Sequence, residues 1–480
     1  MKLLYIDLFC GAGGTSTGVE MATFNGDKCA KVIACVNHDS NAISSHAANH
    51  PNALHFTEDI RTLKLSPLID HTKRIRLLYP DACLVLWASL ECTNFSKAKG
   101  GLPRNADSRT LAEHLFRYIE ALNPDYIQIE NVEEFMSWGD MDENGHPISK
   151  DKGKSYIRWV NNVCKYGYYF DWRILNAADY GAYTSRKRFF GIFARHSLPI
   201  AFPKATHSKY SHNYNHNLFR DDIIKPWKSV RFCLDLHNEG DSIFERKKPL
   251  VEKTLQRIYA GLIKFVAGGK DTFIVKYNSM NSKSGKYIAP GIDEPCPTVA
   301  TQNRLGIAKV MFIRNYSDTI YDNNVVYKKP WIMNTNYGNI GSSIDDPSQT
   351  ITANRKFHYL MSPQFACKGG SFDKPCFTLI DRMDKMPPYL VSTKEGLAIE
   401  IYKTDSPTTI QIKEFMALYG IYDIRMRMLS VTELKRIMGF PEDYTLIGTQ
   451  AEQKKFIGNA VEVNMARVLC EAIYEKLTKK

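Results

Sequence analysis

The chain has 480 residues, of which 44% are hydrophobic and 24% charged, a composition typical of a folded globular protein. At about 150 residues per domain, this length allows roughly two to four domains. No apolar run is long enough to cross a membrane, and Asp7 interrupts the first run too early for a signal peptide. The net charge of +12 favours nucleic acid as a partner, although a basic enzyme without such a partner has the same balance.

The 11 cysteines include no C-x-x-C pair. A disulfide framework or a zinc ribbon is therefore not expected, and the cysteine usage is typical of a reducing compartment such as the cytoplasm. The sequence predicts no metal site.

Short apolar runs alternate with segments of helical spacing through the first 200 residues. The expected strands are 3–9, 31–36, 83–88, 126–129 and 188–194. The expected helices are 15–24, one that begins at residue 40, and 110–122. This alternation predicts an α/β fold with right-handed βαβ units and a mostly parallel sheet. Ligands are then expected at the carboxyl ends of the strands.

The pattern changes near residue 200. Between Lys204 and Arg231, six Lys or Arg residues and several aromatic residues stand against two Asp residues. This combination suits phosphate contacts and base stacking, but a solvated loop explains it equally well.

A weak repeat of the form D-x-P-x-x-T-apolar follows at 293–299, 345–351 and 373–379, with a degenerate copy at 405–410. The uneven spacing argues against a solenoid and favours β-turn-β units. These turns are either structural or DNA contacts. Near the C-terminus, residues 429–441 are expected to form a helix capped by Ser430 or Thr432 and ended by Gly439, and residues 460–477 an amphipathic helix.

Polar residues follow several of the expected strands. The glycine-rich stretch Asp7–Gly14 joins a strand to a helix, which suits close approach of a ligand to the backbone. Asp39 and Asp59 end later segments and could bind a ligand or cap a helix. Cys92 follows a strand on a loop, where nucleophiles are commonly presented, although most free cysteines are inert. Glu130 ends the next strand.

Arg186 and Arg188 stand at the start of a further strand. At i and i+2 on a strand they would face the same side, and could clamp a phosphate or a base carbonyl.

In this order the motifs resemble those of the DNA (cytosine-5) methyltransferases. The matching stretches are Asp7–Gly14, Asp59–Arg61, Cys92 with Asn94–Ser96, Arg109 with Leu111, Glu130–Val132, Thr184–Arg188, Arg427 to Pro441, and Gly458–Val461. The resemblance implies a Rossmann-like, S-adenosylmethionine-dependent methyltransferase fold with a second, mostly β or irregular target-recognition domain. We expect residues 1–200 and 440–480 to form the catalytic domain, and residues 201–439 the target-recognition domain and a connecting segment.

The resemblance also implies roles. Cys92 would attack C6 of a cytosine flipped out of duplex DNA, and Glu130 would donate a hydrogen bond to N3. Arg188 would meet the O2 side of the base, with Arg186 bracing the site. The expected S-adenosylmethionine contacts are Phe9, Gly11, Gly13, Gly14, Asn37, His38, Asp59, Ile60, Leu111, Asn459 and Ala460. Candidate DNA contacts are Ser96, Lys97, Arg304 and Arg355.

The chain departs from the family pattern at several positions, among them Tyr183 and Thr184 in place of a proline and a glutamine. Glu91 and Thr93 replace the proline and glutamine that flank the cysteine, Asn37 replaces a ribose-binding glutamate, and Glu462 replaces a proline. Two alternatives therefore stay open: a tRNA cytosine-5 methyltransferase, and a DNA-binding homologue without activity. We expect a cytoplasmic monomer acting on double-stranded DNA in a restriction-modification system or in phage or host protection, with a cognate restriction endonuclease as a possible functional partner.

Overall fold

The computed structural model describes residues 2–90, 111–138, 153–209, 224–277, 280–281, 284–302, 304–312 and 400–479, and the backbone of five short strands between 331 and 391. The chain divides into two compact units. Unit 1 comprises Met1–His237, Ile292–Leu305 and Met428–Lys480, and unit 2 comprises Asn238–Gly291 and Gly306–Arg427. Within the described residues, no helix is both long enough and apolar enough to span a membrane.

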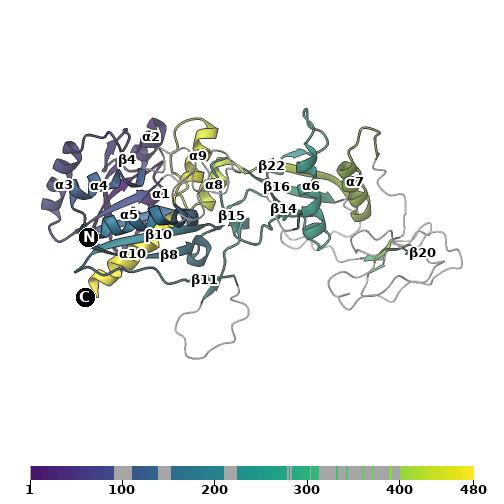
Figure 1. The fold of residues 1–480 in the computed structure, drawn as a ribbon. Helices are drawn as coiled ribbons and strands as arrows, with labels where there is room; N and C mark the ends of the chain where they lie inside the picture. The colour runs from purple at the N-terminus through teal and green to yellow at the C-terminus, as the bar shows by residue number, and fades with distance from the viewer. Residues whose placement is uncertain are drawn as a thin grey trace, which may run out of the picture. The chain divides into compact units, whose positions relative to one another are not determined.

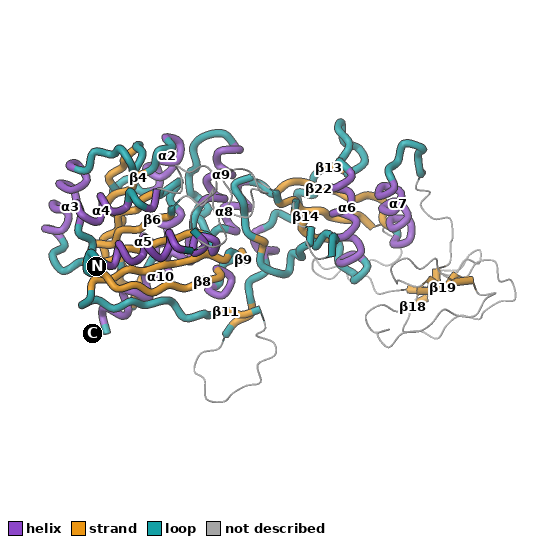
Figure 2. The backbone as a smooth tube through the Cα atoms, viewed as in Figure 1, coloured by secondary structure: helices purple, strands orange, loops and turns teal. Residues whose placement is uncertain are grey.

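Unit 1 is built on a seven-stranded sheet of order β5-β4-β1-β6-β7-β10-β8 (Figures 1 and 2). In that order the strands are Leu54–Phe56, Ala30–Val36, Leu3–Leu8, Cys83–Ser89, Tyr126–Asn131, Lys187–Arg195 and Tyr168–Asn176. The first five run parallel, and β10 runs antiparallel to both of its neighbours. The predicted α/β architecture is confirmed. Because β10 is antiparallel to β7, it begins at the edge of the sheet where β7 ends.

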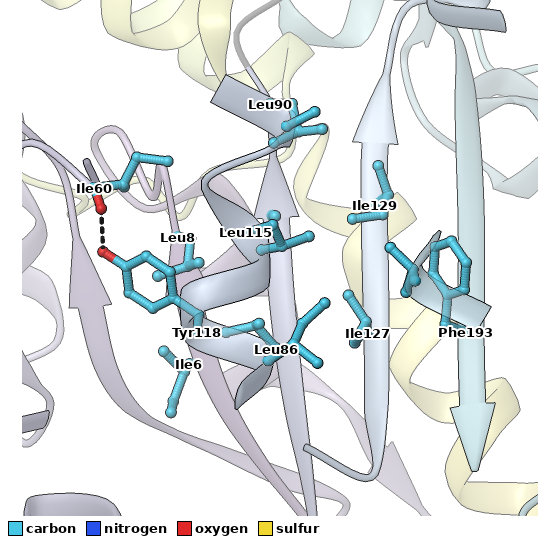
Figure 3. Close-up of a cluster of buried hydrophobic side chains, with 14 of the residues drawn as sticks. Ile6, Leu8, Ile60, Leu86, Leu90, Leu115, Tyr118, Ile127, Ile129 and Phe193 are labelled. Atoms are coloured by element: carbon cyan, nitrogen blue, oxygen red, sulfur yellow. Dashed lines mark hydrogen bonds between the residues drawn. The ribbon is translucent and has the colours of Figure 1, made fainter. Parts of the chain in front are cut away.

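Helices cover both faces of this sheet. The core on one face is formed with α3 (Ser66–Leu78), α4 (Leu115–Leu122) and α5 (Lys154–Cys164). Figure 3 shows part of it, with Tyr118 hydrogen-bonded to the Ile60 carbonyl at 2.9 Å. The core on the other face is formed with α1 (Gly14–Met21) and α10 (Val463–Thr478). Successive strand residues enter opposite cores because their side chains alternate.

The remaining elements of unit 1 are short or lie near its C-terminus. They are β2 (Thr23–Phe24), β3 (Asp27–Lys28), α2 (Ser40–Asn49), η3 (Glu133–Ser137), η5 (Ala177–Tyr180), β9 (Thr184–Ser185), β11 (His207–Ser208), β12 (Lys225–Pro226), η7 (Val230–Cys233), β15 (Cys296–Pro297), α8 (Val431–Ile437) and α9 (Gln450–Asn459).

Unit 1 takes in parts of the expected target-recognition region. The amide groups of Val230 and Arg231 donate to the carbonyls of Glu294 and Ile292, and β15 pairs with β9. These bonds tie 224–237 and 292–305 to unit 1. The expected boundaries at residues 200 and 440 stay a prediction about function, which the division into compact units does not test.

Unit 2 contains a four-stranded sheet of order β13-β22-β16-β14, covered by α6 and α7. Its elements are β13 (Asp241–Ser242), α6 (Glu252–Gly261), a π-helical turn η8 (Leu262–Val266), β14 (Thr272–Lys276), β16 (Leu305–Phe312), which begins on the last residue of unit 1, α7 (Pro407–Tyr419) and β22 (Ile421–Met428). The short strands are β17 (Trp331–Ile332), β18 (Ser342–Ser343), β19 (Tyr359–Met361), β20 (Gly370–Ser371) and β21 (Tyr389–Val391).

Several expected elements have different bounds in the structure. The helix expected over 110–122 begins only at Leu115, and the one expected over 15–24 ends at Met21. Ser430 and Glu433 form the predicted capping box of α8. The degenerate repeat at 405–410 is no β-turn-β unit: Ser406 caps α7, and Pro407 occupies its first turn. The copies at 345–351 and 373–379 lie outside the described residues.

Candidate active site

The candidate site lies where the parallel strands of unit 1 end. The amide of Cys10 donates to the Val36 carbonyl at 3.2 Å, and the amide of Asn37 donates to the Phe56 carbonyl at 3.1 Å. Because β1, β4, β5, β6 and β7 are parallel, the residues that follow them meet at one edge.

The glycine-rich stretch after β1 has an unusual backbone. Phe9, Gly11 and Gly13 have positive φ angles of 61°, 52° and 99°. A Cβ on Gly11 would meet no atom of the described residues within 4 Å, so these residues leave open space beside the turn. A Cβ on Gly14 would lie 2.5 Å from the Val461 carbonyl oxygen. The turn therefore has space for a ligand beside Gly11, and at Gly14 it packs tightly against the C-terminal motif Gly458–Val461.

Asp7, in the strand that precedes this turn, stabilises it through a contact with the following helix. It is buried, and Ser16 of α1 donates to its Oδ2 at 2.7 Å. Burial raises the pKa of Asp7 to about 8, although the hydrogen bond from Ser16 opposes the rise. Asp7 thus links β1 to the first turn of α1.

The acids and amides expected to contact S-adenosylmethionine largely support local structure. Asn37 accepts from the amide of Asp39 at 2.9 Å, and Asp39 caps α2 and lies 3.2 Å from Lys455. Asp59 pairs with Arg61, and this hydrogen bond lowers the pKa of Asp59. The helix-cap interpretation of Asp39 is therefore confirmed. Asn37 and the exposed His38 are the residues that directly follow strand β4.

Ile60 and Leu111 are buried in the core that Figure 3 shows in part. Asn459, the last residue of α9, is exposed, and Ala460 is half-buried beside Gly14. These positions stay predictions as cofactor contacts.

Glu130 and Arg188 meet at the end of β7. Arg188 Nε lies 3.2 Å from Glu130 Oε1, and the Glu130 side chain is 9% exposed. Burial raises the pKa of Glu130, while the charges of Arg188 and Arg186 oppose the rise. Glu130 is thus held in a setting where its protonated form is favoured more than in water, which suits donation of a hydrogen bond.

Arg186 has different partners from Arg188. Its Nη1 donates to the Val299 carbonyl at 2.9 Å and its Nη2 to the Gly458 carbonyl at 3.1 Å, and the residue is 4% exposed. The first D-x-P-x-x-T copy contributes Val299, and its Thr298 donates to the Ser185 carbonyl at 3.0 Å. This copy therefore braces the 184–188 stretch from within unit 1.

Glu462 and Tyr444 are two further residues at the site that the motif pattern did not single out as functional. Glu462 is buried and accepts from the Met465 amide at 2.7 Å as the N-cap of α10. Tyr444 donates to the Ala12 carbonyl at 2.5 Å and covers Gly13. Their signal in the sequence is only their proximity to the matching stretches Arg427 to Pro441 and Gly458–Val461.

Cys92, Ser96, Lys97 and Arg355 lie outside the described residues. Leu90, the last described residue before Cys92, is anchored, since Asn131 donates to its carbonyl at 3.3 Å. Arg304 is described, and its Nε donates to the Gln302 side chain at 3.2 Å.

Comparison with known proteins gives one family. The C-5 cytosine-specific DNA methylase profile matches residues 3–475. The type II methyltransferase M.XorII of Xanthomonas oryzae is 29% identical over 42% of this chain and 43% of its own length. M1.HphI of Haemophilus parahaemolyticus is 27% identical over 44% and 51%. The chain thus spans about half the length of these curated relatives. A solved structure of Spodoptera frugiperda DNMT2 aligns over 99% of this chain and 100% of its own, with 14% identity and a TM-score of 0.47.

Proposed function

From the premise that the chain belongs to the C-5 cytosine-specific DNA methylase family, we propose that it methylates C5 of cytosine in duplex DNA. The methyl donor in this proposal is S-adenosylmethionine, which supplies an electrophilic methyl group. The observation that carries the proposal is the contact between Glu130 and Arg188 at the end of β7.

The chemistry explains this pair. Cytosine C6 accepts a nucleophile only if the charge that develops on the ring is stabilised. A protonated Glu130 would donate to N3, and the raised pKa of Glu130 favours that form. Arg188 would place its guanidinium at the O2 side. Arg186, bound to two backbone carbonyls, acts as a positioning residue that holds the strand carrying Arg188.

The donor site has a matching shape. The open space beside Gly11 and the positive φ angles of the turn allow a ligand to approach the backbone of residues 9–13. Asn37 and His38 follow β4 at the same edge and would contact the ribose.

Cys92 completes the proposal as nucleophile. Its thiolate would add to C6, C5 would take the methyl group and lose its proton, and the thiolate would leave from C6. Because C5 and C6 lie inside the duplex, the cytosine must leave the base stack. Leu90, two residues before Cys92 in the sequence, is held by Asn131, the neighbour of Glu130 in β7.

The biological setting is part of the same proposal. Two relatives are named type II methyltransferases. We propose a role in restriction-modification or in phage or host protection, with unit 2 and the 201–231 segment in target recognition. A cytoplasmic location, a monomeric state and a cognate endonuclease belong to this proposal.

The test is incubation of the protein with tritiated S-adenosylmethionine and either a pool of varied duplex DNA or bulk tRNA, with Cys92→Ala as control. We expect label in DNA from the unchanged protein and none from Cys92→Ala. Duplex DNA that contains 5-fluorocytosine should form a covalent adduct, since fluorine at C5 cannot leave as a proton. Label in tRNA alone would contradict the proposal, and no label in either nucleic acid would favour a homologue without activity.

A further inference from the structure

Below the glycine-rich turn lies a group of thiols and imidazoles that the proposed methyl transfer does not use. Cys10, Cys35 and His46 are all buried, and their ligand atoms lie within 4.8 Å of one another. His55, which is half-buried, places its Nε2 3.0 Å from Nδ1 of His46. Donor atoms from three different segments thus lie around one point, and His55 of β5 stands beside His46 as a fourth donor.

The sheet register explains the convergence. Asp7 of β1 is the register partner of Cys35 in β4, and Cys35 is the partner of His55 in β5. Aligned residues on neighbouring parallel strands project their side chains to the same face. Cys10 follows β1 by two residues, and α2 supplies His46 from above.

The distances suit a tetrahedral metal ion. With Zn–S of about 2.3 Å and Zn–N of about 2.0–2.1 Å, tetrahedral geometry separates sulfur and nitrogen by about 3.5 Å and two nitrogens by about 3.3 Å. Cys35 Sγ lies 3.6 Å from His46 Nδ1, and the two histidine nitrogens lie 3.0 Å apart. A shift of a few tenths of an ångström would satisfy these pairs.

The surroundings of His46 point the same way. Its second ring nitrogen, Nε2, lies 2.9 Å from Ser16 Oγ, and Ser16 in turn donates to the Asp7 carboxyl group. A chain of this kind fixes the orientation of a metal-binding imidazole and leaves Nδ1 directed at the ion. His50 does not belong to the group, because its Nε2 contacts Thr17 at 3.1 Å.

We propose that Cys10, Cys35, His46 and His55 bind one zinc ion. Mixed thiolate and imidazole donors favour Zn²⁺ over the hard cations Mg²⁺ and Ca²⁺. The two thiols would release their protons on binding, so that two thiolates balance the 2+ charge and the buried site carries no net charge. This proposal replaces the expectation of no metal site and does not depend on the proposed methyl transfer.

The ion would join the segments that carry the expected S-adenosylmethionine contacts. Cys10 lies in the turn between Phe9 and Gly11, Cys35 lies two residues before Asn37, and His55 lies in the strand that precedes Asp59. Zinc would therefore stabilise this edge of unit 1 without touching the reacting atoms.

The full chain, purified without chelator and with any affinity tag removed, should contain about one zinc per chain by elemental mass spectrometry. Cys10→Ala should remove the zinc. Cys29→Ala is the matched control, since Cys29 is also buried in unit 1 but belongs to the core formed with α1 and α10 and not to the cluster of Cys10 and Cys35. Zinc retained in Cys10→Ala, or a chain free of zinc that also fails to bind added Zn²⁺, would overturn the proposal.

Two further measurements do not depend on whether Cys10→Ala folds. Co²⁺ added to the chelator-treated, reduced chain should give the thiolate charge-transfer and visible bands of tetrahedral cobalt. Ser16→Ala keeps all four ligands and should weaken zinc binding roughly 10–100-fold in competition with a chromophoric chelator. Octahedral cobalt spectra, or a Cys10–Cys35 disulfide found by mass spectrometry in the chain as isolated, would overturn the proposal.

Discussion

Arg188 Nε lies 3.2 Å from Oε1 of Glu130, at the point where antiparallel β10 begins beside the end of β7. The contact places a cation against a buried carboxyl group whose pKa burial raises. Burial and the arginine thus act on Glu130 in opposite directions, and burial is the larger effect.

Replacing Arg188 with Ala should therefore raise the pKa of Glu130 further, because the positive charge that lowers this pKa most is lost. Arg188→Lys should largely restore the original value. The measurement is the carboxyl band in infrared spectra of chain labelled with ¹³C-glutamate across a pH series, with Glu130→Gln to assign the band. A Glu130 pKa that is unchanged in Arg188→Ala would show that the two groups are not coupled.

If methyl transfer proceeds as proposed, Glu130→Gln should reduce it by roughly 10²–10³-fold, because a neutral amide replaces the acid that would donate to N3. DNA binding should change little, since a carboxyl group is not expected to contact phosphate. Single-turnover rates and a DNA-binding titration separate the two effects. A variant that loses DNA binding and transfer equally would indicate a structural role instead.

Arg186→Met should destabilise unit 1 by about 2–4 kcal/mol, because it leaves the carbonyls of Val299 and Gly458 without their charged donor. Arg173→Met is the control. Arg173 pairs with Asp171 on the surface, where such a pair contributes only about 0–1 kcal/mol. Chemical denaturation followed by tryptophan fluorescence measures the free energy of unfolding of both variants. An equal loss of stability in the two variants would contradict the bracing role of Arg186.

Gly14→Ala should cost about 1–3 kcal/mol, because its Cβ would overlap the backbone carbonyl of Val461. The matched control is Gly268→Ala, whose Cβ would have no neighbour closer than 3.5 Å. We expect the thermal midpoint to fall in the first variant only. A normal midpoint for Gly14→Ala would show that the turn does not dock tightly on the C-terminal motif.

Glu462 should make stability depend on pH. Burial raises its pKa from 4.5 to about 7, so the folded state holds its proton more tightly than the unfolded chain does. Its stabilising contribution is full below pH 4.5 and is lost as the pH rises towards 7, by about 3 kcal/mol at about 1.4 kcal/mol per pKa unit.

Glu462→Gln keeps an acceptor for the Met465 amide and should remove this pH dependence, leaving the variant the more stable protein at pH 8. Urea denaturation at several pH values measures the effect. Glu452→Gln is a useful contrast, because contacts with Thr449 lower the pKa of Glu452 and its effect should have the opposite sign. A wild-type pH profile identical to that of Glu462→Gln would refute the assignment.

Elements with strong local signals were predictable. The apolar runs of β1, β4, β6, β7 and β10 and the capping box of α8 depend on neighbouring residues, and the structure confirms them. The main elements of unit 1 without a prediction were α3, α5, α9 and β8. In β8, most residues are only half-buried or exposed, so the apolar periodicity that reveals a strand is weak.

Among the site residues, the sequence placed Glu130 and Arg188 correctly at strand ends, and the family resemblance already implied a bracing role for Arg186. Spacing alone predicts that residues i and i+2 face the same side of a strand. The rule does not describe the two arginines here, because Arg186 precedes β10 and is not part of a strand. Its guanidinium binds the backbone carbonyls of Val299 and Gly458 instead of facing the same ligand as Arg188.

The sequence by itself determined the family, the strand-end positions of the motif residues and the expected donor, since these depend on the identity and order of residues along the chain. Only the tertiary structure decided which backbone carbonyls Arg186 binds, that Glu462 is buried, and that Cys10, Cys35 and His46 come together next to His55. The physical reason is that sheet register and helix docking bring distant residues into contact, and no local spacing in the chain encodes that proximity.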